Sequence, residues 1–503
     1  MSFESPAAQA PFSARDRVTR GVAWKGVSSG STQVMRFAVG IVLAHLLSPH
    51  DYGVAGMVVV FATLVFVFSD LALGAALVQR DELTEEDRST VFWTSAAVGL
   101  VLTLVGVAVS GPLAAFYGEP RVRPLFAAMS VTFLLAALAS TQTALLTREM
   151  NFRSLELRQI GAALASGAVG VGLAASGYGP WAVIGQQIAA IAASSALLWV
   201  ASPWRPSFVF SRASLRSVAG YSGNVFGARL LFYFNRNADN LLVGRFLGAS
   251  ALGAYSVAYN VILMPFSQIA VPIQDVLFPA FARLQGDVRA LAAGWLRANR
   301  IVGAITTPAL LGLVVVAPDF VDAVLGARWH SAVPVVQILA WVGLIQALQG
   351  LNGSVLRAVD RTNLLLRYAI VVVTASLIAF VVGLQWGIVG VAAAYAISST
   401  LVEPYYTWLT ARAVGLTLGD FLRSLRGVAE ASLLMFAVVL VARLALIEAG
   451  VGQLARLGLV ILIGAAVYAP ACLWRAPEVA SELKVLRGRR APSAHPIAAE
   501  PAL

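Results

Sequence analysis

The chain has 503 residues, of which 59% are hydrophobic and 12% charged, and its mean hydropathy is +0.79. Soluble domains are about 45–50% apolar and about 25% charged, so this composition excludes a soluble protein and indicates an integral membrane protein. One cysteine, Cys472, and four histidines predict neither a disulfide framework nor a metal site. The net charge of +11 lies in short segments between apolar runs, which indicates membrane orientation and no nucleic-acid partner.

The chain begins with a polar, basic segment, residues 1–21, without a short apolar core followed by a small-residue cleavage site. We therefore expect no cleaved signal peptide. A helix needs about 20 mostly apolar residues to cross the hydrocarbon core of a membrane. Fourteen segments are predicted to do so: 22–47, 53–78, 90–110, 124–146, 158–176, 180–200, 217–244, 252–280, 301–317, 333–356, 364–383, 387–410, 430–448 and 453–474.

The loops between these spans differ in positive charge. Loops on the side of the two termini hold 27 Lys and Arg residues, whereas loops on the other side hold five. Positively charged loops remain in the cytoplasm during insertion, so both termini are predicted to be cytoplasmic. Because both termini are predicted to lie on the same side of the membrane, the number of spans is predicted to be even.

Two pairs of segments predict an internal repeat. LLSPHDYGVAG from Leu46 aligns with FLGASALGAYS from Phe246 at an offset of 200, which matches Gly53 with Gly253. GPWAVIGQQIA from residue 179 aligns with GIVGVAAAYAI from residue 387 at an offset of 208. Such offsets superpose span 1 on span 7, and six crossings preserve orientation, so the halves are predicted to be parallel repeats.

The predicted fold is therefore an all-α polytopic membrane protein with two six-helix lobes and two additional helices. Lobes that face each other suggest alternating access around a central cavity. The predicted divisions are a cytoplasmic segment at 1–21, an N-lobe at 22–205, a C-lobe at 206–415, spans 13 and 14 at 416–475, and a basic, disordered cytoplasmic tail at 476–503.

Span 7 is unusually polar for a membrane helix. Arg236 lies seven residues after Arg229, which turns it by only about 20° on an ideal helix, and Tyr233 and Asn240 lie near the same stripe. An unpaired charge in hydrocarbon costs at least about 2.5–3.5 kcal/mol, so these residues are expected to face a cavity. Guanidinium groups bind phosphate through paired hydrogen bonds, which suits an anionic substrate.

Span 1 carries a similar stripe. Lys25, Ser29, Thr32 and Arg36 lie within about 40° of one another on an ideal helix. The repeat offset places Arg36 close to Arg236, so both lobes are predicted to present cations to one cavity. The predicted substrate-binding residues are Arg36, Arg229, Arg236, Asn240, Lys25 and Tyr233.

Acidic and amide side chains near these stripes are predicted to balance the arginines or to carry a coupling cation. They are Asp239, Asp70, Asp275 and Gln268. An alternative remains open, in which Arg236 and Asp239 simply pair at a spacing of three residues and the other arginines extend to the interface. Arg443 is predicted to be such an interfacial anchor.

The segment at 226–287, which contains YFNRNADNLLVGRFLGASALGAYSVAYN, closely resembles the Wzx-type polysaccharide exporters of the PST family. That family belongs to the larger multidrug/oligosaccharidyl-lipid/polysaccharide exporter superfamily. LLSPHDYGVAGMVVVF at 46–61 and SGYGPWAVIGQQ at 176–187 resemble further parts of the family pattern, and the likeness extends over residues 17–475.

The resemblance implies a flippase that moves undecaprenyl-pyrophosphate-linked oligosaccharides to the periplasmic leaflet for exopolysaccharide, capsule or O-antigen synthesis. It also implies residence in a bacterial inner membrane, with a polysaccharide polymerase and a chain-length regulator as potential partners. No cofactor is expected. No GxxxxGK[ST] phosphate loop is present, so coupling to an H⁺ or Na⁺ gradient, or consumption of the product, is the expected energy source.

Three other functions predict different sequence features. An ion-coupled drug antiporter of the same superfamily is expected to have acidic and aromatic residues in its cavity, whereas this chain has arginine stripes. A membrane polysaccharide polymerase is expected to have a large external loop, but the longest predicted external loops are short, at 111–123 and 318–332. A structural scaffold leaves charged residues within membrane spans unexplained.

Overall fold

The computed structural model describes residues 32–69, 77, 83–219, 222–265, 281 and 286–488. Within these residues the secondary structure is helical, with no strand. The chain divides into two compact units, Met1–Ser256 and Val257–Leu503. The boundary between the N-lobe and the C-lobe, which the sequence analysis puts between residues 205 and 206, remains a prediction.

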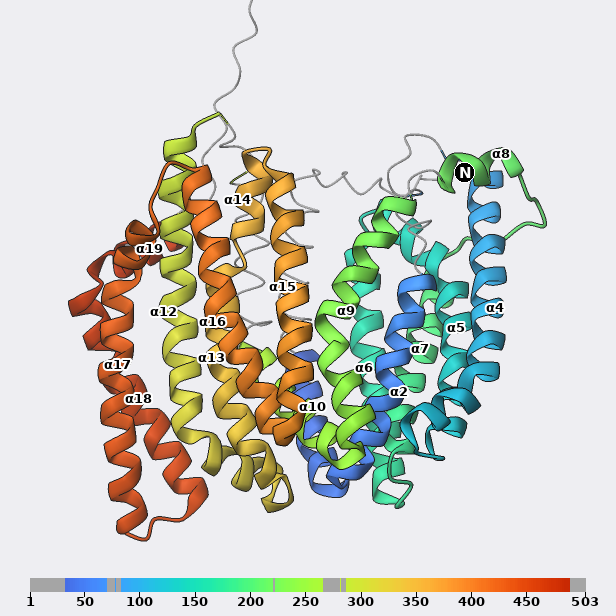
Figure 1. The fold of residues 1–503 in the computed structure, drawn as a ribbon. Coiled ribbons are helices and arrows are strands. Elements are labelled where there is room, and N and C mark those ends of the chain that lie inside the picture. Colours follow the sequence, from blue (N-terminus) through green and yellow to red (C-terminus); the bar gives the residue numbers. More distant parts are fainter. Residues whose placement is uncertain are drawn as a thin grey trace, which may run out of the picture. The chain divides into compact units, whose positions relative to one another are not determined.

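The first unit consists of long helices. In this unit α4 packs on α5, α5 and α6 pack on α7, and α2 packs on α9. These helices run alongside one another in Figure 1. The helices are Thr32–Leu46, α2 (Pro49–Ser69), α4 (Glu85–Tyr117), α5 (Val122–Arg148), α6 (Phe152–Ala175), α7 (Trp181–Ala201), α8 (Arg212–Ala219) and α9 (Ser222–Leu247), and α10 (Ala249–Pro265) begins in it.

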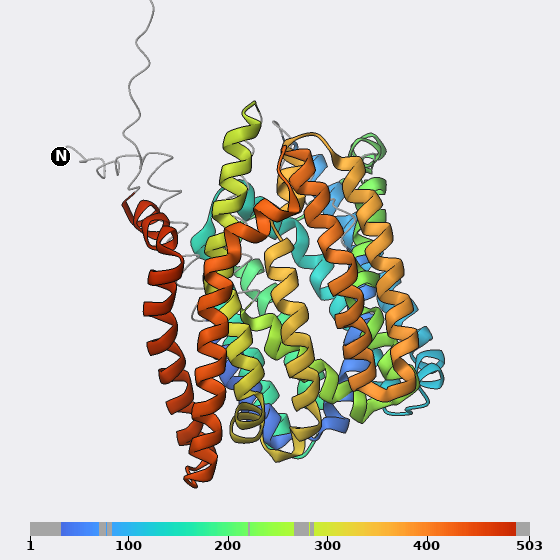
Figure 2. The same ribbon diagram turned by 60° about the vertical axis from the view of Figure 1, so that its left-hand side comes forward.

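The second unit is built on α12, which packs against α13, α17 and α18, while α15 pairs with α16. Figure 2 shows α17 and α18, coloured red, as a long antiparallel pair. The elements are α12 (Val288–Phe320), η2 (Val321–Leu325), η3 (Ala327–Ala332), α13 (Val333–Gln349), α14 (Asn352–Ala358), α15 (Thr362–Gly383), η4 (Leu384–Trp386), α16 (Gly387–Ala413), α17 (Leu418–Glu448), α18 (Gln453–Arg475) and α19 (Pro477–Gly488).

Several helices begin well before the predicted spans. Thr84 and Asp87 form a reciprocal capping box at the start of α4, and Thr417 and Asp420 form another at the start of α17. Asp287 caps α12 by accepting a hydrogen bond from the amide of Ala290. Each cap satisfies amides of a polar first turn, so the helix extends beyond the apolar stretch that hydropathy detects.

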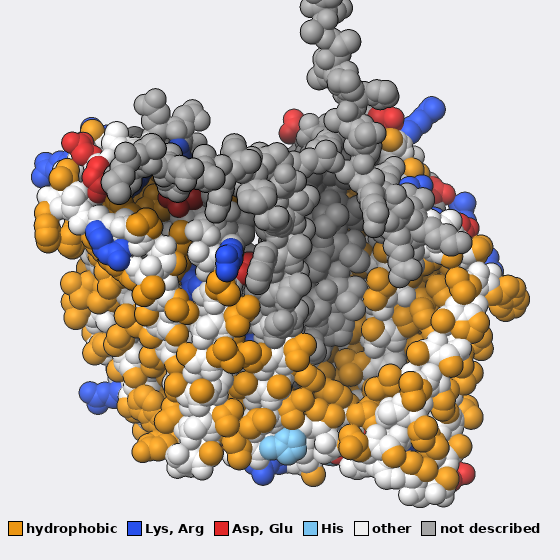
Figure 3. Space-filling model, turned by 180° about the vertical axis from the view of Figure 1, so that it is seen from behind, with side chains coloured by type: hydrophobic (Ala, Val, Ile, Leu, Met, Phe, Trp, Pro, Cys, Tyr) orange, Lys and Arg blue, Asp and Glu red, His pale blue; other side chains and the backbone are white. Residues whose placement is uncertain are grey.

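Ten helices among the described residues are long and apolar enough to cross a membrane. The prediction of an all-α polytopic membrane protein is therefore confirmed. The count of fourteen spans and the internal repeat stay predictions. Figure 3 shows one face of the surface, where hydrophobic side chains predominate and charged side chains gather mainly toward the upper margin.

A close crossing of α2 and α10 in the first unit depends on two glycines. A Cβ atom on Gly53 would lie 1.6 Å from the carbonyl oxygen of Ala249, and one on Gly253 would lie 1.9 Å from that of Pro49. The contact is reciprocal, because both pairs are related by the offset of 200 found in the sequence. Only hydrogen in place of a side chain allows the two backbones to approach this closely.

We expect Gly53→Ala to destabilise the protein by about 1–3 kcal/mol, because the new methyl group collides with backbone that has no rotamer to change. The matched control is Gly111→Ala on α4, where no atom lies within 4 Å of the added methyl group. Thermal unfolding of the two purified variants in detergent measures the difference. Equal melting temperatures would contradict the crossing.

The second unit ends in α19, which folds back on α12. Arg297 and Arg300 of α12 approach the buried Glu482 carboxylate at 3.7 and 3.5 Å. Burial raises the pKa of the Glu482 carboxyl group, and the two arginines oppose that shift. The helix that follows the last predicted span is thus attached to the unit by charge as well as by apolar contacts.

Candidate functional site

Polar residues on α9 contact its neighbours in the first unit. The Tyr233 side chain is buried, and its hydroxyl group donates a 2.6 Å hydrogen bond to the carbonyl oxygen of Val60 on α2. This bond joins two helices that are far apart in the sequence. Tyr233 was predicted to contact substrate; in this structure its hydroxyl group is engaged in helix packing.

Asp239 lies almost two turns further along α9 and is also buried, at 3% exposure. Tyr255 of α10 donates a 3.0 Å hydrogen bond to one carboxylate oxygen, and the backbone amide of Asn240 donates to the other at 2.7 Å. The Asn240 side chain is half-buried and accepts a 3.4 Å hydrogen bond from Ser256. The polar side of α9 therefore docks partly onto α10.

Arg236 differs from these neighbours because its side chain is exposed. It lies near the middle of a 26-residue helix and acts electrostatically on Asp239. The predicted counterpart, Arg36, is also exposed, on the helix Thr32–Leu46. The two described arginines of the predicted stripes, Arg36 and Arg236, thus both have exposed side chains.

The remaining predicted site residues are not placed. Lys25, Asp70, Gln268 and Asp275 lie outside the described residues. Arg229 belongs to α9, but its side chain lies outside the described part. Their predicted roles stay predictions.

Sequence reasoning missed a buried carboxylate in the second unit. Glu403 of α16 is 6% exposed, and Tyr368 of α15 donates a 2.6 Å hydrogen bond to its Oε2 atom. The Tyr368 ring stacks on Tyr406, with 3.7 Å between the ring centroids. The sequence did offer a signal for Glu403, since it is an acidic residue within the predicted span 387–410. Ionisable residues inside membranes are usually functional. Asp239 with Tyr255 is the corresponding carboxylate–tyrosine pair of the first unit.

A chain of amide and hydroxyl groups lies beside Glu403. Gln349 donates hydrogen bonds to the backbone carbonyl of Glu403 at 3.1 Å and to the hydroxyl of Thr407 at 2.7 Å. Asn352 donates to Gln349, and the indole of Trp295 donates to Asn352 at 3.1 Å. These bonds connect α12, α13, α14 and α16, so the surroundings of Glu403 are ordered by a polar network within the unit.

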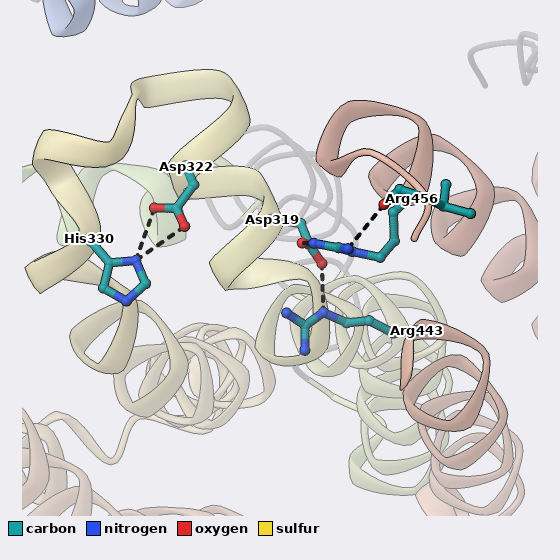
Figure 4. Close-up of polar contacts among 6 residues, drawn as sticks. Asp319, Asp322, His330, Arg443 and Arg456 are labelled. Atoms are coloured by element: carbon teal, nitrogen blue, oxygen red, sulfur yellow. Dashed lines mark hydrogen bonds and ion pairs between the residues drawn. The ribbon is translucent and has the colours of Figure 1, made fainter. Parts of the chain in front are cut away.

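A second charged cluster in this unit corrects the prediction for Arg443. Asp319 is buried at 2% exposure, and its carboxylate accepts hydrogen bonds from Arg443 Nε at 2.6 Å and Arg456 Nε at 2.9 Å. Figure 4 shows both guanidinium groups directed at this carboxylate. Arg443 is therefore an ion-pair partner that joins α17 to α12, and the prediction of an interfacial anchor was wrong.

The neighbouring pair in Figure 4 is more exposed. His330 lies 3.0 Å from Asp322, and the histidine side chain is largely open to its surroundings. Among the described residues, no group of three His, Cys, Asp or Glu side chains has the arrangement of a metal site. The buried carboxylates Asp239, Glu403 and Asp319 accept side-chain hydrogen bonds from tyrosine or arginine.

Comparisons with known proteins agree with this architecture. The family described as "Polysaccharide biosynthesis protein" matches residues 42–334. Among curated relatives, the teichuronic acid biosynthesis protein TuaB of Bacillus subtilis is 28% identical over 418 residues, which cover 81% of this chain and 85% of TuaB. The lipopolysaccharide biosynthesis protein WzxC of Escherichia coli is 27% identical over 385 residues, which cover 76% of this chain and 78% of WzxC.

Solved structures show the same fold. The lipid II flippase MurJ in an inward closed conformation has a TM-score of 0.75 at 16% identity, covering 91% of this chain and 100% of that chain. An inward-facing multidrug transporter of the MATE family has a TM-score of 0.61 at 14% identity, covering 76% and 94%. Proteins with different cargo share the fold, so the substrate has to be inferred from side chains.

Proposed function

Because this chain belongs to the polysaccharide biosynthesis protein family, we propose that it is a flippase for lipid-linked oligosaccharides. The cargo is an oligosaccharide unit carried on undecaprenyl pyrophosphate. The protein moves it from the cytoplasmic to the periplasmic leaflet, where it serves the synthesis of exopolysaccharide, capsule or O-antigen.

The observation that carries the choice of an anionic cargo is Arg236. Its side chain is exposed near the middle of α9, whereas the side chains of Tyr233 and Asp239 are buried. A guanidinium group matches two phosphate oxygens with two parallel hydrogen bonds. A cationic drug would gain nothing from such a group, so Arg236 favours the pyrophosphate carrier over the drug-antiporter alternative.

A polar headgroup cannot cross hydrocarbon unaided, because each unsatisfied polar group costs several kcal/mol there. A cavity that opens alternately to the two sides lowers this cost for the pyrophosphate and the sugars, while the prenyl chain remains in lipid. The exposed arginines at positions 36 and 236 are the described residues that we assign to the headgroup. The site carries out no covalent chemistry in this mechanism.

The proposed location is the inner membrane of a bacterium, with both termini in the cytoplasm. This orientation rests on the excess of Lys and Arg in the loops on the side of the termini. A polymerase and a chain-length regulator are proposed partners, since the exported unit has to be polymerised in the periplasm.

We also propose that transport is coupled to an H⁺ or Na⁺ gradient through the buried carboxylates Asp239 and Glu403. Each accepts a side-chain hydrogen bond from a tyrosine, at 3.0 and 2.6 Å. Burial opposes the charged form of a carboxylate, so binding of a cation to either group is favourable. The ionisable groups around Glu403 are Tyr368, Tyr406 and Arg357, the last of which acts on Tyr406.

For H⁺ coupling, we expect Glu403→Gln to abolish the stimulation of flipping by a pH gradient, because glutamine still accepts the bond from Tyr368 but does not titrate. The control is Glu448→Gln, which alters an exposed residue at the end of α17. The measurement is the rate of flipping of a fluorescent lipid-linked oligosaccharide in proteoliposomes. The ratio of the rate with the gradient to the rate without it is compared between variants. An unchanged ratio in Glu403→Gln would exclude this residue as the proton carrier.

The proposed function itself is tested in a strain from which the gene is deleted. Radiolabelled undecaprenyl-linked sugars should accumulate facing the cytoplasm, where a probe added to the periplasmic side cannot reach them, and the restored gene should release them. Accumulation of translocated but unpolymerised glycolipid would instead place the defect downstream and favour a polymerase.

A further inference from the structure

The second unit contains a charged hollow of about 410 Å³ between α12, α17 and the corner from α18 to α19. Gly427 forms part of its floor, where a Cβ atom would lie 2.1 Å from the carbonyl oxygen of Arg475. Four arginines and two glutamates line the hollow. Two further carboxylates, Asp420 and Glu482, pair with its arginines, and Glu482 also pairs with Arg297, so the whole cluster of five arginines and four carboxylates has an excess of one positive charge. The charged lining residues are Arg300, Arg423, Arg426, Arg475, Glu430 and Glu478.

The internal ion pairs leave donors available in this hollow. Arg426 Nε donates a 2.7 Å hydrogen bond to Glu430, which also binds Arg475, so one carboxylate is shared by two guanidinium groups. Arg423 lies 3.3 Å from Asp420, and its side chain is 77% exposed. A guanidinium group has five N–H donors, and these pairs occupy only some of them. The three guanidinium groups therefore have more donors than these pairs use.

Exposed apolar side chains next to these arginines in the sequence indicate the source of an anion that would bind these donors. Leu422, Leu473 and Trp474 are 59%, 59% and 74% exposed, and they adjoin the arginines in sequence. The guanidinium group of Arg475 lies 5.1 Å from the centre of the Trp474 ring. Tryptophan and arginine at the end of a membrane helix are typical of the level of the lipid headgroups. A small soluble anion would contact only the arginines, whereas a lipid would contact the arginines with its phosphate and the apolar side chains with its acyl chains.

We propose that this hollow binds the phosphate of an anionic glycerophospholipid from the surrounding bilayer. The phosphate lies between Arg423, Arg426 and Arg475, and the glycerol and acyl chains extend over Leu473 and Trp474. In the predicted topology these helix ends are cytoplasmic, where anionic lipids attract basic clusters. The site uses residues of α12 and α17–α19, none of which is assigned to the cargo, and its test is independent of transport.

Native mass spectrometry of the purified full-length protein tests the proposal by counting bound lipids. Phosphatidylglycerol should bind in preference to phosphatidylcholine. In Arg423→Gln/Arg426→Gln, phosphatidylglycerol should bind about thirtyfold more weakly, since each basic residue contributes about 1 kcal/mol at an anionic lipid surface. Glu430 retains Arg475 in this variant. The matched control, Arg289→Gln/Arg367→Gln, removes two exposed arginines outside the hollow and should bind as the unaltered protein does.

A competition with inorganic phosphate distinguishes a lipid site from a site for a small anion. Inorganic phosphate at about 10 mM should leave the bound phosphatidylglycerol in place; full displacement would show a site for a small soluble anion and overturn the lipid assignment. Equal binding by the hollow variant and its control would also overturn the proposal. If the double variant elutes as aggregate, Arg423→Gln alone carries the same test, with an expected loss of about fivefold.

Discussion

Arg236→Ala should strongly reduce polysaccharide export while leaving the amount of protein in the membrane nearly unchanged. The side chain is exposed, so its loss removes an anion-binding group and little packing. A hydrogen bond to a charged group contributes about 1.5–3 kcal/mol, which corresponds to a loss of about tenfold to over a hundredfold in the rate of flipping. The orientation of radiolabelled undecaprenyl-linked sugars in the complemented deletion strain is the measurement.

Two comparisons identify the cause of the loss. Arg236→Lys should restore export only in part, because an ammonium group keeps the charge but lacks the two parallel donors. Arg245→Ala removes another exposed arginine from the last turn of the same helix, where the guanidinium group lies over Phe116 and Phe246, and should export at the normal rate. Export at the normal rate in Arg236→Ala would contradict the proposal that α9 carries a cationic site for the cargo.

The largest loss of stability is expected from Asp319→Asn. The substitution preserves the shape of the side chain but removes the charge that Arg443 and Arg456 share. Removal of one partner from a buried ion pair costs about 3–5 kcal/mol. The Arg443 and Arg456 side chains, which lose their partner, are 16% and 11% exposed, so the loss should lie toward the lower end of that range. Equilibrium unfolding of the purified protein in mixed micelles measures this change in the free energy of unfolding.

Asp322→Asn is the matched control for this prediction. It makes the same substitution three residues later, and the partner there is the exposed His330. Exposed ion pairs contribute about 0–1 kcal/mol, so this variant should unfold almost as the unaltered protein does. Similar unfolding free energies for the two variants would mean that the Asp319 cluster does not hold α17 and α18 to α12.

The sequence alone determined the class of the protein and the approximate place of its long helices. A hydrocarbon core demands about 20 apolar residues per helix, so the requirement is visible in the sequence itself. The structure has helices in each predicted range, but caps such as Thr417 with Asp420 extend them beyond the apolar stretch. Sequence similarity and the exposed Arg236 both favour an anionic, lipid-linked cargo. The roles of Lys25, Arg229 and the other unplaced residues are predicted from the sequence pattern alone.

Only the tertiary structure decided which polar side chains meet. The hydrogen bond from Tyr233 to Val60 joins residues 173 positions apart, and that from Arg443 to Asp319 joins residues 124 positions apart. Helices that are apolar on every side carry no hydrophobic stripe to indicate the packed face, and in lipid no hydrophobic force selects it. Close packing at small residues and a few interhelical hydrogen bonds select the neighbours instead. For that reason the sequence marked Tyr233 and Asp239 as unusual, and the fold was needed to show that their side chains pack helices together whereas that of Arg236 is exposed.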